Sequence, residues 1–154
     1  MHKARLRRLE WVYTGCPVYF LTACTASRRP LLADPDVHDV FFRFGLTAAG
    51  RGVWVGRYVL MPDHLHLFAA FAANALALPA WTKALKGAIS QALRNRGLAS
   101  PFWQKGFFDH VMRSAESYEQ KWNYVHENPV RKGLVSRAED WPYQGEIHPL
   151  AVLD

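Results

Sequence analysis

Residues 53–71 read VWVGRYVLMPDHLHLFAAF, and this stretch decides the fold class. It contains two apolar runs, 53–60 and 65–71, in which β-branched and aromatic residues are frequent, as is typical of strands. A turn at Met61-Pro62-Asp63 separates the two runs. We therefore expect two consecutive strands, the second of which lies at the centre of a sheet.

The sequence on either side of this pair predicts further strands and helices. Residues 17–24 form a compact apolar run and residues 102–112 are rich in aromatic side chains, so each segment predicts a strand. One helix is expected between the capping residue Asp34 and Gly50, and another begins at Pro79. The element order is β-α-β-β-α-β, which predicts an α+β protein with a ferredoxin-like fold: a four-stranded antiparallel sheet with both helices on one face.

An additional helix is expected after this core. Ser114 is a suitable N-cap, and Glu116 lies in the first turn, where the helix dipole favours a carboxylate. Pro129 is expected to end the helix. The remaining residues, 137–154, are expected to fold back irregularly.

Length and composition are typical of one globular domain. The 154 residues have a mass of 17.6 kDa, and 50% of them are hydrophobic, with 6 Trp, 6 Tyr and 9 Phe. This supply of apolar side chains excludes a disordered chain and a scaffold that depends on disulfides, so residues 1–154 are expected to form a single domain. Cys16 and Cys24 are interpreted as reduced core residues. No segment resembles a signal peptide or a membrane span, and we expect a cytoplasmic protein.

The chain carries an excess of positive charge, +6 at pH 7. Residues 65–108 contain no acidic residue. A stretch of one charge sign on a compact domain suggests a polyanionic partner, most often nucleic acid, although a solvated surface would have the same composition. The basic residues of this stretch are Lys83, Lys86, Arg94, Arg96 and Lys105, and a second cluster at the start of the chain is Lys3, Arg5, Arg7 and Arg8.

His64 and His66 lie two residues apart at the start of the central strand. Because side chains alternate along a strand, the two imidazoles share one face of the sheet, with their α-carbons about 6.6 Å apart. We expect this face to be exposed and to point away from the two packing helices. Two imidazoles in this arrangement can bind one metal ion, and two histidines without a ligand are the alternative interpretation.

The late helix has two distinct faces. At about 100° per residue, Tyr118, Trp122 and Val125 share one face, which we expect to be buried. Tyr124 lies about 120° from that stripe, and Asn128, four residues later, is its neighbour. Tyr124 is therefore the tyrosine that is free to react, unless it is an exposed residue without a role.

Two segments together resemble the signatures of one protein family. Residues 58–67 read YVLMPDHLHL and residues 124–135 read YVHENPVRKGLV, and both are similar to segments of REP-associated tyrosine transposases. This group is part of the single-tyrosine, insertion-sequence-200-like branch of the HUH endonucleases. Residues 102–110, FWQKGFFDH, are also similar, and the resemblance covers the chain from about Tyr13 to Trp141.

The resemblance implies the fold derived above and a site for DNA cleavage. By position, Tyr124 would be the nucleophile, and His64 and His66 would bind a divalent ion, Mg²⁺ or Mn²⁺. Asn128 lies where relatives have a third polar ligand, which is usually Gln in the mobile enzymes. Attack by the tyrosine on single-stranded DNA beside a palindromic hairpin would leave a 5′-phosphotyrosine and a free 3′-hydroxyl.

The resemblance also implies hairpin DNA as the partner, and it leaves both a monomer and a homodimer open. The basic residues that we expect to contact DNA are Lys83, Lys86, Arg94, Arg96, Lys105, Lys121 and Arg131. The alternative function is an inactive, domesticated protein of the same fold that binds hairpin DNA without cleaving it.

Three other protein classes lack support in the sequence. A histidine-triad hydrolase would need a further histidine at the position of Phe68, and a zinc peptidase would need a His-Glu-x-x-His motif. An RNA-recognition module shares the ferredoxin-like topology but would carry a Gly-Phe-rich aromatic strand, and the chain has none.

Overall fold

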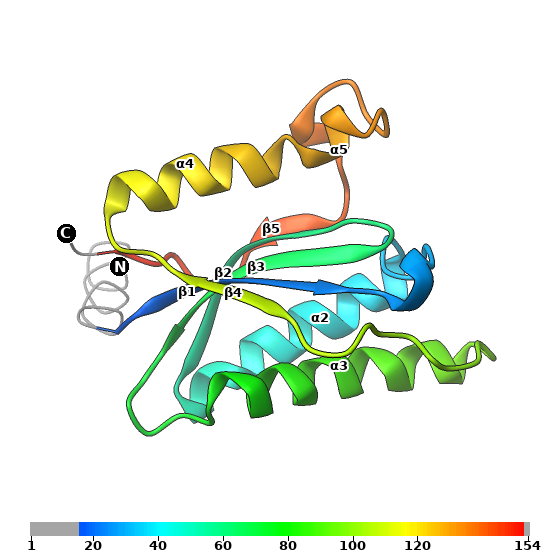
Figure 1. Ribbon diagram of the computed structural model, residues 1–154, viewed down its shortest axis with the longest axis horizontal. Helices are drawn as coiled ribbons and strands as arrows, with labels where there is room; N and C mark the ends of the chain where they lie inside the picture. The colour runs from blue at the N-terminus through cyan, green and yellow to red at the C-terminus, as the bar shows by residue number, and fades with distance from the viewer. Residues whose placement is uncertain (1–15, 153–154) are drawn as a thin grey trace, which may run out of the picture.

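The computed structural model describes residues 16–152, so the basic cluster at the start of the chain lies outside the described residues. Strands and helices follow one another in the expected order up to residue 126, and a further short helix and a further strand come after it (Figure 1). The strands are β1 (Val18–Cys24), β2 (Val53–Leu60), β3 (His64–Phe71), β4 (Phe108–Val111) and β5 (Gln144–Glu146). The helices are α2 (Pro35–Ala48), α3 (Leu78–Asn95), α4 (Ala115–His126) and α5 (Asn128–Arg131), and short 3-10 turns lie at Ala26–Arg28, Ala49–Arg51 and Ala138–Asp140. Among residues 16–152, no helix is long and apolar enough to cross a membrane.

The sheet has the order β4-β1-β3-β2-β5, and each neighbouring pair is antiparallel. The first four strands have the ferredoxin-like arrangement, which confirms the predicted fold class. The expectation of an irregular tail over 137–154 was wrong, because β5 adds a fifth strand beside β2. Long-range hydrogen bonds draw the tail to this edge: the indole of Trp141 donates to the carbonyl of Leu60 (3.0 Å), and the Leu60 amide donates to the carbonyl of Tyr143 (2.8 Å).

The fourth strand is shorter than the predicted segment 102–112. The first part of that segment runs along α3, and side chains of α3 form hydrogen bonds with it. The indole of Trp103 donates to the Ser90 hydroxyl (2.9 Å), and the Lys86 ammonium donates to the carbonyl of Gly106. Residues 102–104 still bond to the end of β1 and the turn after it: the Gln104 amide donates to the carbonyl of Cys24 (2.9 Å), and Thr25 forms an isolated bridge with Trp103. Regular pairing with β1 begins at Phe108.

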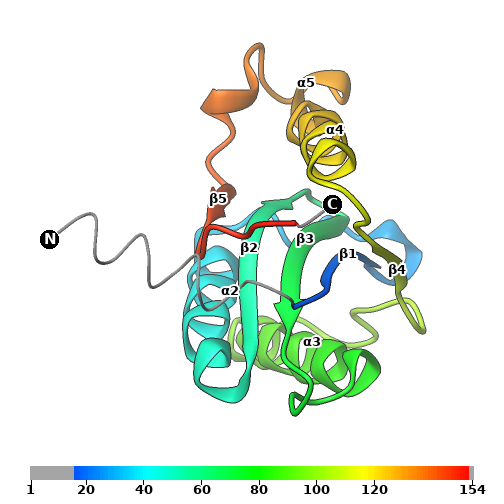
Figure 2. The same cartoon turned by 90° about the vertical axis from the view of Figure 1, so that its left-hand side faces the viewer.

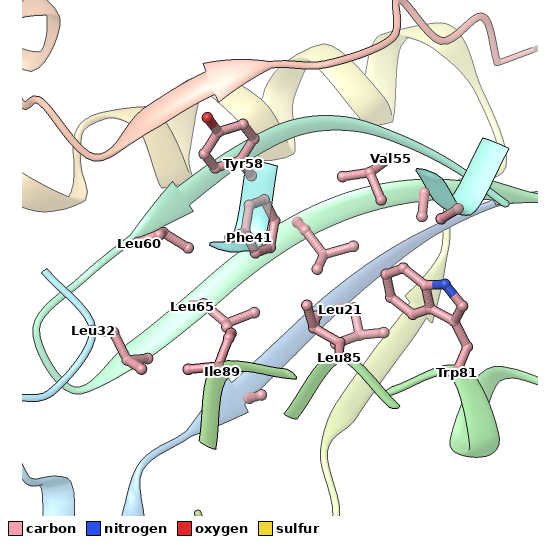
Figure 3. Close-up of a cluster of buried hydrophobic side chains, with 14 of the residues drawn as sticks. Leu21, Leu32, Phe41, Val55, Tyr58, Leu60, Leu65, Trp81, Leu85 and Ile89 are labelled. Atoms are coloured by element: carbon pink, nitrogen blue, oxygen red, sulfur yellow. The ribbon is translucent and has the colours of Figure 1, made fainter. Parts of the chain in front are cut away.

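Helices cover both faces of the sheet. α2 and α3 lie on one face and α4 lies on the other, as the two views agree (Figures 1 and 2). The alternation along β3 separates the two layers, because Leu65 and Leu67 pack in the core with α2 and α3, whereas Phe68 and Ala70 pack in a cluster with Tyr118 of α4. Figure 3 shows the first of these cores, where side chains from β1, β3, α2 and α3 meet.

A register shift in β2 directs one side chain of this strand toward α4. The shift lies between Val55 and Tyr58, which both pack in the core with α2 and α3. The extra residue turns Arg57 toward the opposite face. There the Arg57 guanidinium pairs with the carboxylate of Glu119 (2.9 Å) and lies 5.4 Å from the centroid of the Tyr118 ring.

The predicted start of α4 is confirmed, whereas the predicted role of Pro129 at its end is not. Ser114 is the N-cap, and its hydroxyl accepts a hydrogen bond from the Ser117 amide (3.0 Å), as expected. α4 ends at His126, but Pro129 does not stop the chain from being helical, because it lies in the first turn of α5. Proline is tolerated in a first turn, where its missing amide hydrogen has no helical partner to lose.

Truncation of a core leucine should destabilise the fold. Leu85 of α3 is 1% exposed, so Leu85→Ala should lower the free energy of unfolding by about 2–5 kcal/mol through lost burial and a residual cavity. Urea titration followed by circular dichroism measures this change.

The matched control is Leu46→Ala on α2, where the side chain is 46% exposed and the same change should alter the free energy of unfolding by less than about 1 kcal/mol. Equal losses in the two variants would contradict the assignment of the core to the sheet face under α3.

Candidate functional site

His64 and His66 converge on a single side chain. Their ring centroids are 4.7 Å apart on the sheet face opposite α2 and α3. The amide nitrogen of Asn128, the first residue of α5, lies 3.2 Å from Nε2 of His64 and 3.4 Å from Nε2 of His66. The structure thus brings together the three residues that the sequence proposed as metal ligands.

The two imidazoles are more buried than the sequence suggested. His64 is only 6% exposed and His66 is half-buried, so the expectation of an exposed face was wrong for His64 and holds only in part for His66. Helix α4 covers that face of the sheet. Val125 of α4 packs there with Val59 of β2 and with Met61, the residue that follows β2. The ring of Phe20 also lies against His66, with centroids 5.2 Å apart and planes 20° from parallel.

The δ nitrogens of both imidazoles have partners. Nδ1 of His64 donates to the Asp63 carboxylate (2.8 Å), whose other oxygen accepts from the Arg28 guanidinium (2.9 Å). Nδ1 of His66 lies 2.8 Å from the hydroxyl oxygen of Thr22, which can accept the ring proton. When Nδ1 carries the proton, the lone pair of Nε2 points to the common centre, which is the arrangement of a metal-binding imidazole.

Sequence reasoning missed these three partners. Asp63 precedes His64 directly, so its chemistry was visible in the turn that separates the two apolar runs. Thr22 and Arg28 are far from the histidines in sequence and reach them only through the pairing of β1 with β3 and through the turn that follows β1.

Both imidazoles are held in the neutral form. Burial lowers the pKa of His66 to about 3, and the positive charges of Lys121, Arg131 and Arg28 add to this effect. Burial also lowers the pKa of His64, although the Asp63 carboxylate acts in the opposite direction. A neutral imidazole is the form that binds a metal ion, so these shifts favour ligation at neutral pH.

The donor set fits a small divalent ion. Two imidazole nitrogens and one amide would leave positions free for water or for a phosphate oxygen. The amide of Asn128 turns its nitrogen to the imidazoles and its oxygen to Arg131 (3.4 Å), so ligation by the oxygen would require the amide to rotate. Within residues 16–152, no further His, Cys, Asp or Glu joins the pair to make a larger ligand cluster.

Tyr124 lies on the exposed side of α4. Its side chain is 65% exposed, whereas Tyr118 and Val125 are 4% and 2% exposed, which confirms the predicted division of the helix into two faces. The Arg131 guanidinium lies 3.9 Å from the centroid of the Tyr124 ring. Because Arg131 also contacts the oxygen of Asn128, one side chain connects the tyrosine to the histidine centre.

The residues predicted to contact DNA fall into two groups. Lys121 and Arg131 lie near the histidines, with the Lys121 ammonium 5.3 Å from the Phe20 ring and Arg131 over Tyr124. The others lie on α3 or in the chain that follows it, in the layer behind the sheet: Lys83, Lys86, Arg94, Arg96 and Lys105.

Three residues of the second group make contacts within the protein. Arg96 pairs with the carboxylate of Asp34, Lys86 donates to backbone carbonyls, and Arg94 lies 5.8 Å from the Phe102 ring. The structure therefore does not bring the α3 cations to the histidine centre, and their contact with DNA stays a prediction.

Comparison with known proteins relates the chain to one group. The family model described as "Transposase IS200 like" matches residues 17–128. The chain is 29% identical over 154 residues to a Haemophilus influenzae protein assigned as a REP-associated tyrosine transposase, with 89% of this chain and 88% of that protein covered. It is 24% identical over 125 residues to a REP-associated tyrosine transposase of Escherichia coli, with 81% and 73% covered.

Two solved structures share the fold. A REP-associated tyrosine transposase bound to a REP hairpin superposes with a TM-score of 0.69 at 19% identity, over 92% of this chain and 93% of that one. A protein from Deinococcus radiodurans assigned as a transposase superposes with a TM-score of 0.55 at 24% identity, over 75% and 92%.

Because the pKa of His66 is lowered in the folded protein, the free energy of unfolding should decrease as the pH falls. Below about pH 6.5 the unfolded chain binds a proton at this histidine, whereas the folded chain does not do so until about pH 3. Between about pH 7 and about pH 5, in a buffer with chelator, the wild type should lose about 2 kcal/mol more free energy of unfolding than His66→Gln. Urea titrations of both proteins at the two pH values measure this difference, and equal losses would contradict a neutral, buried imidazole.

Proposed function

The chain belongs to the IS200-like family of transposases, and we propose that it cleaves and rejoins single-stranded DNA beside a palindromic hairpin, with Tyr124 as the nucleophile. One observation carries this proposal: His64, His66 and Asn128 converge beside a helix that presents an exposed tyrosine. The partnered δ nitrogens and the neutral state of both imidazoles support the same reading of the site.

In this proposal, His64, His66 and Asn128 hold a divalent ion, Mg²⁺ or Mn²⁺. The bound ion would polarise the scissile phosphate and offset its negative charge. Asp63 and Thr22 orient the two imidazoles through their δ nitrogens, and Arg28 in turn holds the Asp63 carboxylate. Imidazole ligands favour Mn²⁺ and an amide oxygen suits Mg²⁺, so the donor set accommodates either ion.

Tyr124 would perform the covalent step. Its phenolic oxygen attacks the phosphorus, the bond from phosphorus to the 3′-oxygen breaks, and that oxygen leaves as a 3′-hydroxyl after it gains a proton. The phenolic proton is released to water, and the product is a 5′-phosphotyrosine. The Arg131 guanidinium lies over the ring, so its positive charge would stabilise the phenolate that forms as the oxygen loses its proton. Because the phosphodiester energy is retained, the 3′-hydroxyl can attack the phosphotyrosine and restore the strand.

Charge near the site and one relative support hairpin DNA as the substrate class. Lys121 and Arg131 supply cations on the face that carries the histidines, where a phosphate backbone would approach. One of the solved relatives is bound to a REP hairpin, and its fold extends over most of this chain.

Removal of one hydroxyl should abolish covalent capture. With a labelled hairpin oligonucleotide from a repeated palindrome of its own genome and Mn²⁺ or Mg²⁺, the wild type should form a covalent protein–DNA adduct. Tyr124→Phe should form none, because it lacks the attacking oxygen, while its affinity for the hairpin should change by less than about 1 kcal/mol. Denaturing gel electrophoresis detects the adduct, and fluorescence anisotropy measures the affinity.

Tyr118→Phe is the matched control for this experiment. The Tyr118 hydroxyl is buried and has no hydrogen-bond partner among the described residues, so its removal should leave the adduct intact. An adduct that persists in Tyr124→Phe would refute the nucleophile assignment. A wild type that binds the hairpin and never forms an adduct would favour the inactive binding protein instead.

Metal binding should stabilise the wild type and depend on the two histidines. At about 100 times the dissociation constant of Mn²⁺, the free energy of unfolding should rise by about 2.7 kcal/mol, which moves the thermal midpoint by roughly 5–10 °C. His64→Ala and His66→Ala should lose this shift, and Asn128→Ala should reduce it. Differential scanning fluorimetry with and without MnCl₂ gives these values.

Two further variants test the specificity of this response. His38→Gln should keep the full shift, because His38 lies on α2 and bonds to Tyr58 (2.6 Å) in the layer behind the sheet. Asp63→Asn should bind Mn²⁺ about 10–100-fold more weakly, since it weakens the partner of Nδ1 of His64. A shift that survives in His66→Ala, or disappears in His38→Gln, would place the ion elsewhere.

A further inference from the structure

Phe108 is an exposed aromatic side chain at the edge of the sheet. It is 72% exposed, more than any other large hydrophobic side chain among residues 16–152, and it lies on the edge strand β4. A single exposed apolar residue is unremarkable, but folded proteins usually place charged residues on an open sheet edge, where an apolar ring invites aggregation. The position of this ring relative to the histidines is what suggests a role.

The strand register places Phe108 on the face of the sheet that carries the histidines. Phe108 of β4 pairs with Thr22 of β1, and Thr22 pairs with His66 of β3. Cross-strand partners project to the same face, and the Thr22 hydroxyl contacts His66 directly (2.8 Å). With neighbouring strands about 4.8 Å apart, the Phe108 backbone is about 10 Å from that of His66.

The surface between Phe108 and the histidines is aromatic and basic. Phe20 lies next to Thr22 on the same face of β1 and stacks on His66, and the Lys121 ammonium lies 5.3 Å from the Phe20 ring. His110, the exposed partner of Phe20 on β4, shares this face. Asp109 lies between Phe108 and His110 on β4. It pairs with Leu21, which packs in the core with α2 and α3, so Asp109 points to the face of the sheet without the histidines.

We propose that Phe108 stacks on an unpaired DNA base that adjoins the phosphate bound at the histidine centre. Every base has an aromatic face, so one exposed ring can bind a neighbouring nucleotide whatever its sequence. Lys121 and His110 face the backbone that connects this base to the scissile phosphate. The inference rests on the proposed function in one respect, namely that the DNA phosphate lies at His64 and His66.

A nucleotide fits this surface better than a protein segment does. Phe108 is strongly exposed, whereas the neighbouring Phe20 ring is half-buried against His66, so the exposed apolar area is small, and the Lys121 ammonium accompanies it. Its continuity with the histidine centre through Thr22 and Phe20 also favours a ligand that extends into that centre.

The experiment measures base stacking directly. The probe is a hairpin oligonucleotide with a single-stranded tail, on the 5′ or the 3′ side, in which 2-aminopurine replaces each tail base in turn. Stacking quenches the fluorescence of 2-aminopurine, so the full-length wild type should quench it at one tail position. Phe108→Ala should lose this quenching and bind the tailed hairpin about 5-fold to 100-fold more weakly, with unchanged affinity for the hairpin without a tail.

Two variants serve as controls. Phe108→Trp keeps an aromatic face and should retain both quenching and affinity. Phe42→Ala removes a partly exposed phenylalanine from α2, on the opposite side of the sheet, and should behave as the wild type.

Several outcomes would overturn the inference. These are quenching that persists in Phe108→Ala, absence of quenching at every tail position, and equal loss of affinity for tailed and trimmed hairpins. A loss of self-association or of binding to another protein in Phe108→Ala, with DNA binding intact, would assign the ring to a protein contact.

The two proposals can fail independently. Quenching is also measured in Tyr124→Phe, which cannot form the adduct. Quenching that depends on Phe108 without any adduct from the wild type would refute the cleavage reaction and leave the stacking site. An adduct from the wild type without such quenching would refute the stacking site and leave the cleavage reaction.

Discussion

Antiparallel pairing of β3 with β1 and β2 is the constraint on which the rest of the structure depends. The two-residue alternation of β3 sends Leu65 and Leu67 into the core with α2 and α3, and it sends His64 and His66 to the opposite face. A register slip of one residue would exchange the two faces, burying imidazoles in the apolar core and exposing leucines. The free energy of burying that core therefore also holds the two imidazoles side by side.

The second helix layer turns this pair into a site. α4 packs on the histidine face through Tyr118 and Val125, and Arg57 reaches it from the register shift in β2. Because Tyr118 and Val125 face the sheet, Tyr124, about 120° away around the helix, lies in solvent. The short helix α5 then begins with Asn128, whose amide closes the space above both imidazoles.

Burial has an electrostatic consequence at this site. Removal of the imidazoles from water lowers the pKa of each, and nearby cations lower that of His66 further. Asp63 compensates in part, since its carboxylate accepts the Nδ1 proton of His64 and is itself held by Arg28. Both imidazoles therefore stay neutral and can bind a cation. The guanidinium of Arg131, which lies over the Tyr124 ring, favours an anionic phosphate or phenolate.

Local patterns in the sequence determined the element order, the shared face of His64 and His66, and the split of α4 into a buried Tyr118 and an exposed Tyr124. Each of these depends on periods of two or 3.6 residues, which neighbouring residues set by themselves. Only the tertiary structure decided the burial of the imidazoles, their contacts with Thr22 and Arg28, the addition of β5, and the placement of the α3 cations behind the sheet. These features come from contacts between segments far apart in the chain, and their free energies depend on packing and strand register that no local pattern records.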